Sequence, residues 1–294
     1  LDFPLKAGEI FDRLVNVHEE EPEIEADKLK KIVELVREGR LETMGGNYFL
    51  PGREYLVPLR LKKEKIWKLK IKKARRAVRW LHFLPYIKGV LASGSLATGN
   101  TDELSDLDVL IIAGHGRIWT ARFLVTGLLE LLGVRRRSWD KVAPDKICLN
   151  HYITDFSLLI NLPSAYNAQT YINLKPIILN DGRLENRFKE ENAWVLDHVK
   201  HWPVWDSGYK IENSFFPKII SMLCEKIFDT WLGDWLEKTA ERYQERRIQK
   251  NPLTYIPGSR VSYSDKQLEF HPESPENIVL AKYLNRLKRL NLAR

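Results

Sequence analysis

Two aspartates separated by a single leucine stand at the entrance of an apolar run in "SDLDVLIIA", residues 105–113. Residues two apart in a β-strand point to the same side, so Asp106 and Asp108 are expected to face together while Leu107 faces the core. Two adjacent carboxylates repel each other unless a cation neutralises them, and Mg²⁺ prefers carboxylate and phosphate oxygens. The pair is therefore a candidate metal site, and the segment upstream of it decides in favour of this interpretation. The alternative is that one aspartate caps a turn and the other lies on an exposed strand edge.

A glycine turn precedes this pair in "SGSLATGN", residues 93–100, directly after an apolar run. Such a turn exposes successive backbone N–H groups at the start of a helix, where they can hold phosphate oxygens. The Ser95 hydroxyl would add a donor, so Gly94 and Ser95 are predicted to bind a nucleotide triphosphate. The turn lacks the lysine of a Walker loop and the pattern of a nucleophile elbow, which argues against P-loop NTPases and serine hydrolases.

The order of these features resembles the signature of the DNA polymerase β-like nucleotidyltransferase superfamily: a strand, Gly94-Ser95, ten residues, Asp106-Leu107-Asp108 and an apolar strand. The resemblance covers residues 85–160 and extends more weakly into the following half. It implies an α/β (α+β) core with a mixed sheet, and transfer of a nucleoside monophosphate from an NTP to an acceptor hydroxyl with release of pyrophosphate. It also implies two Mg²⁺ ions, or Mn²⁺ in their place, on Asp106 and Asp108.

The resemblance further implies a third carboxylate, from a later strand, that helps to deprotonate the acceptor. The matching segment is "DKICLNHYITD", residues 145–155. Strict alternation places Cys148, Asn150 and Tyr152 on one face, and none of them is acidic. The nearby acids lie before or beyond the strand: Asp140, Asp145 and Asp155. Asn150 is the candidate for the third position, as a neutral replacement that keeps an oxygen. This leaves open slow catalysis, a different base, or nucleotide binding without turnover.

Several basic residues and histidines follow or surround these motifs. Arg117 and Arg122 flank Trp119 at the start of the next predicted helix. They are predicted to bind the nucleotide, because the planar guanidinium suits phosphate, although a structural arginine beside a carboxylate is an equal alternative. The run of arginines at 135–137 is expected to form a solvated or polyanion-facing loop outside the site. The seven histidines form no compact ligand cluster in the sequence, which argues against zinc.

The elements that must position these residues divide the chain into four parts. The predicted division is a winged-helix-like module at 1–58, a basic amphipathic helix at 59–84, the nucleotidyltransferase core at 85–162 and a mostly helical C-terminal domain at 163–294. In the first part, the apolar spacing predicts helices over 7–15 and 25–39, followed by a hairpin that turns at Gly45-Gly46.

Two interpretations of the N-terminal module stay open. A winged helix can read DNA, and the chain would then be a transcription regulator. A packing or dimerisation role is preferred, because acidic residues that would repel phosphates precede or begin the second helix: Glu19, Glu20, Glu21, Glu23, Glu25 and Asp27.

Residues 60–79 carry eleven Lys or Arg and one Glu. Apolar residues at three- and four-residue spacing predict a helix that packs one stripe and exposes positive charge on its other faces. Contact with a polyanion and a merely solvated face are equally expected. The first interpretation favours tRNA or another RNA end as the acceptor over a small molecule or a protein side chain.

The composition is that of a globular protein with anionic partners, with a net charge of +8 and 44% hydrophobic residues. Apolar runs too short to span a bilayer, two cysteines and the lack of a recognisable leader favour a cytoplasmic protein without membrane contact. The leading hypothesis is a Mg²⁺-dependent nucleotidyltransferase. The main alternative is a weakened member of the fold that binds nucleotide or nucleic acid as a sensor or scaffold.

Overall fold

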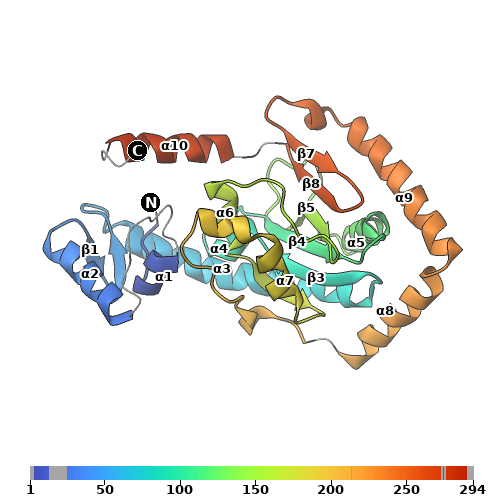
Figure 1. Cartoon of the computed structure of the whole chain (residues 1–294), viewed down its shortest axis with the longest axis horizontal. Coiled ribbons are helices and arrows are strands. Elements are labelled where there is room, and N and C mark those ends of the chain that lie inside the picture. Colours follow the sequence, from blue (N-terminus) through green and yellow to red (C-terminus); the bar gives the residue numbers. More distant parts are fainter. Residues whose placement is uncertain (1–2, 13–24, 213, 273, 275, 290–294) are drawn as a thin grey trace.

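The centre of the computed structural model is a mixed sheet of six strands in the order β6-β3-β4-β5-β8-β7 (Figure 1). The strands are β3 (Ile87–Ala92), β4 (Leu107–Ala113), β5 (Ile147–Thr154), β6 (Lys175–Leu179), β7 (Arg260–Tyr263) and β8 (Gln267–His271). Strands β4 and β5 run parallel, and the other neighbours are antiparallel. The structure describes residues 3–12, 25–212, 214–272, 274 and 276–289.

Apolar side chains fill both faces of the sheet, because the central strands are near-continuous apolar runs. One face packs against helices α3 (Leu56–Val78), α5 (Ile118–Leu131) and α9 (Trp231–Gln249). The other face packs against α6 (Ala165–Tyr171), α7 (Leu184–Glu191) and the segment that carries Trp202 and Trp205. On β4, Val109 and Ile111 belong to the first cluster, whereas Leu110 and Ile112 belong to the second. Asp108 is therefore on the second face.

Three strands of the sheet come from residues beyond 162, the part that was expected to be a mostly helical C-terminal domain. Strand β6 pairs with β3, and β8 pairs with β5. Each of the three strands has five residues or fewer and lies between helical patterns, so local periodicity does not reveal it. The predicted boundary at residue 162 therefore runs through the sheet.

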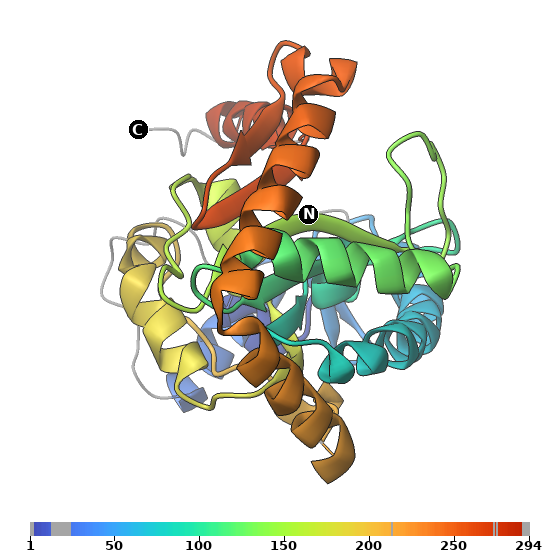
Figure 2. The ribbon, with the colours of Figure 1, turned by 90° about the vertical axis from the view of Figure 1, so that its right-hand side faces the viewer.

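Two long helices lie along one side of the sheet. Helices α8 (Phe215–Phe228) and α9 form an arm along this side, and α9 crosses α5 (Figures 1 and 2). Helix α10 (Glu276–Arg289) contacts α6. Short 3₁₀ turns are η1 (Arg79–Phe83), η2 (Ala193–Asp197), η3 (Ser207–Tyr209) and η4 (Pro252–Tyr255). Within the described ranges, none of the helices has both the length and the apolar character needed to cross a bilayer.

The N-terminal elements are α1 (Ala7–Asp12), α2 (Glu25–Arg37) and the hairpin of β1 (Glu42–Met44) with β2 (Asn47–Phe49). The predicted turn is confirmed, with left-handed backbone at both Gly45 and Gly46. The buried Arg60 of α3 binds Glu9 and the Pro4 carbonyl, which fixes α1 to the basic helix. The end of the first predicted helix and four of the acidic residues fall within 13–24, outside the described residues. The winged-helix assignment stays a prediction.

Candidate functional site

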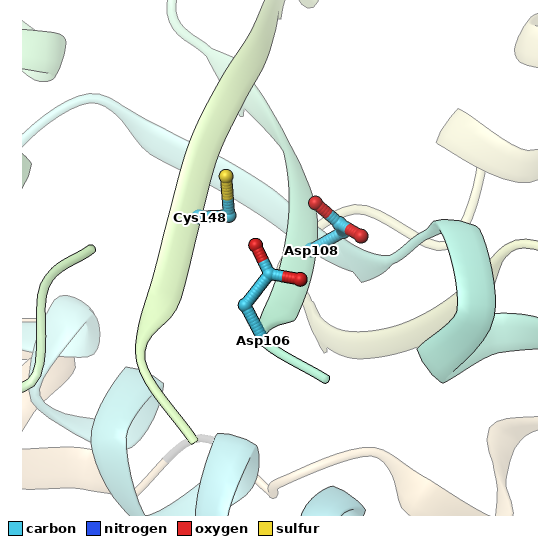
Figure 3. Close-up of side chains that lie close together, drawn as sticks. All are labelled: Asp106, Asp108 and Cys148. Atoms are coloured by element: carbon cyan, nitrogen blue, oxygen red, sulfur yellow. The ribbon is translucent and has the colours of Figure 1, made fainter. Parts of the chain in front are cut away.

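Asp106 and Asp108 lie together at the start of β4, beside Cys148 of β5 (Figure 3). Cys148 is the register partner of Asp108 on the parallel neighbouring strand. One ligand atom from each of the three side chains lies within 4.8 Å of those of the other two. The structure thus brings the two aspartates onto one side, as the alternation predicts, and adds a thiol to them.

Gly94 touches this acidic pair from the end of β3. Its φ is +55°, and a Cβ at this position would lie 2.8 Å from Oδ2 of Asp108. The Ser93 N–H donates a hydrogen bond of 3.0 Å to the Asp108 carbonyl, which holds the turn against β4. Ser95 follows in the first turn of the short helix α4 (Gly94–Thr98). Only a residue without a side chain fits between the turn and the carboxylate, so glycine is required here for close approach as well as for its φ.

The surroundings of Asp108 oppose its ionisation. Burial, and then the charge of Asp106, raise the pKa of Asp108 to about 6, against the lowering effects of Asn150 and Arg136. The Arg136 Nη1 donates to Asp106 Oδ2 at 2.5 Å and lies 3.8 Å from Cys148 Sγ. Burial, together with the two carboxylate charges, raises the pKa of the Cys148 thiol, which keeps it protonated in the free protein. The site thus holds two acids, a neutral thiol and one guanidinium.

Arg136 corrects the expectation that residues 135–137 form a solvated loop outside the site. The loop folds back along β5, where Arg135 forms a parallel backbone β-bridge with Ile147. The Arg136 N–H donates to the Ile147 carbonyl. This pairing points the Arg136 side chain at Asp106. No local pattern in the sequence indicates it, because the contact spans 30 residues and depends on how the loop returns.

Asn150 also contacts the pair, through a bulge in β5. Its Nδ2 donates to Asp108 Oδ1 at 3.2 Å, and its Oδ1 accepts from the Cys148 thiol at 2.8 Å. The register shifts after Cys148, so that Leu110 pairs with His151. Strict alternation is therefore wrong for Tyr152, which packs in the core cluster on the opposite face. A bulge inserts one residue and reverses the facing of everything after it.

The three acids near β5 are engaged elsewhere. Asp145 binds Lys70 and Lys73 of α3, Asp155 accepts from the His115 N–H, and Asp140 accepts from the Arg137 N–H. Over the residues that the structure describes, Cys148 alone joins the two aspartates in a potential metal-binding group. The position next to Asp108 on β5 is thus held by a thiol and an amide.

Comparison with protein families matches residues 71–160 to the model described as a nucleotidyltransferase domain. Residues 71–160 are thus similar to a nucleotidyltransferase domain. The match confirms the resemblance to the polymerase β-like superfamily and contains the Gly94 turn, both aspartates, Cys148 and Asn150. Neither the curated proteins nor the solved structures gave a match.

The fold does not bring Arg117 and Arg122 to the carboxylates. Arg122 lies in α5 and Arg117 is the N-cap residue just before it, and α5 packs on the opposite face of the sheet. Arg117 Nη2 pairs with Asp234 Oδ1 of α9 at 2.8 Å. Arg122 donates to Gln244 of the same helix, and its guanidinium carbon lies 4.4 Å from the centre of the Phe270 ring. Their positions do not support the predicted nucleotide-binding role, since they anchor α9 to α5.

Lys70, one of the many cations of the basic helix α3, holds the loop before Asp106. The buried Lys70 Nζ donates to the Ser105 carbonyl at 2.7 Å, to the Glu103 carbonyl at 3.2 Å and to Asp145 at 3.0 Å. Trp67, one helical turn away, donates through Nε1 to the Leu96 carbonyl at 2.6 Å. The inner face of α3 therefore positions both halves of the site, the glycine turn and the aspartate loop.

The donor set of this site fits a divalent cation. Two carboxylate oxygens converge, and the adjacent guanidinium shows that positive charge is already drawn to them. Hard cations such as Mg²⁺ take carboxylate oxygens together with phosphate oxygens of a substrate. Asp106 and Asp108 would hold such an ion, with Cys148 as the nearest third donor.

Proposed function

We propose that the protein is a Mg²⁺-dependent nucleotidyltransferase that moves a nucleoside monophosphate from an NTP to an acceptor hydroxyl and releases pyrophosphate. The observation that carries the proposal is the acidic pair packed directly against the Gly94 turn inside a nucleotidyltransferase domain. Like charges at this separation are unfavourable in the free protein, and a cation with a bound triphosphate removes the repulsion.

Each residue has a distinct part in this reaction. The backbone N–H groups of the Gly94-Ser95 turn bind oxygens of the triphosphate, and Asp106 and Asp108 hold the metal. When bound, Mg²⁺ neutralises the charge that develops on the reacting phosphate. Asn150 keeps Asp108 oriented by donating to Oδ1. With a metal held by Asp106, the Arg136 guanidinium would be released from this carboxylate and would pair with the triphosphate or with pyrophosphate.

In this reaction, one bond forms for each bond that breaks, and no atom of the protein becomes part of the product. The acceptor oxygen forms a bond to the α-phosphorus, the bond from that phosphorus to the bridging oxygen breaks, and pyrophosphate leaves. The hydroxyl proton passes to solvent, because no third carboxylate joins the pair among the described residues. A slower reaction than that of an enzyme with a carboxylate base is expected.

The outer face of α3 supports an RNA acceptor. Its inner face is occupied by contacts with the site, through residues such as Trp67 and Lys70. The opposite face exposes four cations at helical spacing: Lys65, Lys68, Lys72 and Arg76. A row of this kind follows a phosphate backbone, and each contact releases counterions. The row lies on the same helix that positions the loop before Asp106.

The test is incubation of the full-length protein with each labelled NTP, Mg²⁺ and total RNA, followed by separation of RNA, protein and small molecules. Label is expected on RNA, and Asp106→Asn and Asp108→Asn are expected to reduce transfer at least ~100-fold while the fold is kept. Asp234→Asn is the matched control, because this acid lies on the opposite face and pairs with Arg117. Wild-type transfer by both site variants would refute the assignment.

The acceptor has its own test. Replacement of Lys68, Lys72 and Arg76 by Gln is expected to weaken RNA binding and to flatten its dependence on salt, with NTP binding unchanged. The control replaces three other exposed cations by Gln: Arg242 and Arg246 of α9, and Lys250 at the C-cap of this helix. Equal loss in both triple variants would remove the argument for α3. Label on protein or on a small molecule would keep the reaction and change the acceptor.

A second function is favoured by one observation, the absence of an acidic side chain from the position next to Asp108, where Cys148 and Asn150 lie. A nucleotide-binding protein without turnover would still need the metal pair and the turn. Binding of Mg²⁺-NTP with no label transferred to RNA, protein or small molecules would establish this alternative.

A further inference from the structure

We propose that Cys148 is the third metal ligand of this site and shifts its preference from Mg²⁺ towards divalent transition metals that accept sulfur. The inference rests on the proposed function only in taking Asp106 and Asp108 as metal ligands. It concerns which ion this chain selects, and it can fail while nucleotidyl transfer with Mg²⁺ still holds.

The first step is the geometry of the three donors. Cys148 is the register partner of Asp108, and its sulfur lies within 4.8 Å of an oxygen of each aspartate. Metal–sulfur bonds of about 2.3 Å and metal–oxygen bonds of about 2.1 Å place such atoms within ~4 Å of each other around one ion. Small side-chain rotations close the difference, because Cys148 and Asp108 are already held opposite each other by the strands.

The second step is the environment of the sulfur. A free cysteine that fills space packs among apolar side chains. Cys148 instead has polar neighbours: its thiol donates to Asn150 Oδ1 at 2.8 Å, and Arg136 Nη1 lies 3.8 Å from Sγ. It is half-buried at the polar edge of the sheet, with the two carboxylates beside it. This is a donor facing a charged site.

The third step is that two nearby acids, within the part of the chain that the structure describes, are engaged elsewhere. Asp145 is bound by Lys70 and Lys73, and Asp155 caps the turn at His115. Asn150 already donates to Asp108, which orients that ligand. Binding of a metal to the Cys148 sulfur releases the thiol proton to solvent. The resulting thiolate adds one negative charge, which offsets part of the charge of the ion.

The chemistry of sulfur then decides the preference. Mg²⁺ takes oxygen ligands and keeps its waters, and it gains little from a thiolate. Transition metals such as Co²⁺ and Zn²⁺ bind thiolate and carboxylate together. The site therefore offers Mg²⁺ two protein ligands and offers a sulfur-accepting metal three. A carboxylate at position 148 would reverse this preference.

The experiment is a titration of the metal-free, full-length protein with Co²⁺, read by the near-ultraviolet charge-transfer band of a cobalt–thiolate bond. The chain has two cysteines, so Cys224→Ser leaves Cys148 as the sole thiol without changing the site. We expect the band in the wild type and in Cys224→Ser at one equivalent of Co²⁺. Its absence from Cys224→Ser would overturn the proposal, whether or not Co²⁺ binds.

Two further variants sharpen the result. Cys148→Ser is expected to lose the band and at least ~10-fold in Co²⁺ affinity, with Mg²⁺ affinity unchanged. Cys148→Asp is expected to gain Mg²⁺ affinity, measured by calorimetry. Equal Co²⁺ affinities of Cys148→Ser and wild type would refute ligation by sulfur. RNA labelling with Mg²⁺ in the same preparations reports separately on the proposed function.

Discussion

Charged side chains on the two faces of the central sheet differ in the partners that surround them. Between α5 and α9, the Glu237 carboxylate accepts N–H groups of Trp119 and Thr120 at 2.9 and 2.8 Å, and Arg122 donates to Gln244. At the edge of the other face, Asp106 and Asp108 lie together with one guanidinium. The first arrangement is complementary within the chain and fastens a helix. The second places two carboxylates beside a single guanidinium, an arrangement typical of a ligand site.

This contrast also separates two kinds of arginine. Arg122 lies deep between α5 and α9, where burial lowers its pKa to about 10. Arg136 is partly exposed, and Asp106 raises its pKa against the effect of burial. From the sequence, Arg122 was predicted to bind the nucleotide, and Arg136 was predicted to lie in a solvated or polyanion-facing loop. Their contacts favour the reverse assignment. We therefore expect substitution of Arg122 to change stability and substitution of Arg136 to change nucleotide binding.

The largest effect is expected at Gly94. Gly94→Ala would place a methyl group 2.8 Å from Asp108 Oδ2 at a φ of +55°, so we expect at least a ~100-fold loss of nucleotide transfer. Gly99→Ala is the matched control, because Gly99 has a φ of +74° and open space within 4 Å of the position that a Cβ would take. The control should lose about 1 kcal/mol of stability and keep its activity. Equal losses of activity would show that backbone strain alone is responsible.

The next effect concerns the two arginines. Arg122→Met is expected to lower the free energy of unfolding by about 2 kcal/mol, because it removes the donor to Oε1 of the buried Gln244 at the α5–α9 interface, with nucleotide affinity unchanged. Arg136→Met is expected to weaken NTP binding about 10-fold with little change in stability. Chemical denaturation and nucleotide titration measure the two quantities. The opposite division would restore the role that the sequence predicted for Arg122.

The smallest effect is a dependence of stability on pH. Burial, and then the charges of His271 and Arg260, lower the pKa of His151 to about 3. Since an unfolded histidine has a pKa of about 6.5, the contribution of His151 is fully present above that pH and is lost as the pH falls towards 3. Burial also lowers the pKa values of His82 and of His271, the latter to about 4, so they act in the same direction.

The measurement is urea denaturation of the wild type and His151→Asn between pH 7.5 and 5. The variant is expected to lose less stability than the wild type over this range, by up to about 1.4 kcal/mol per pH unit below 6.5. Parallel pH profiles would mean that His151 is protonated to the same extent in the folded and unfolded states.

The sequence by itself determined the parts of the site that depend on neighbours in the chain. Alternation over a short strand brought Asp106 and Asp108 to one side, and the Gly94 turn followed from residue type and position. The strands and helices of residues 85–160, the hairpin at Gly45-Gly46 and the basic helix also follow from local periodicity. These features need no long-range contact to be specified.

Tertiary structure alone decided which further side chains join the aspartates. A bulge in β5 retained Asn150 beside Asp108 and turned Tyr152 to the other face, and a returning loop delivered Arg136. Packing placed α5 with Arg117 and Arg122 on the far face, and pairing recruited β6, β7 and β8 to the sheet. The physical reason is that local periodicity fixes how a segment faces, whereas register and the side that a helix covers depend on contacts between distant segments.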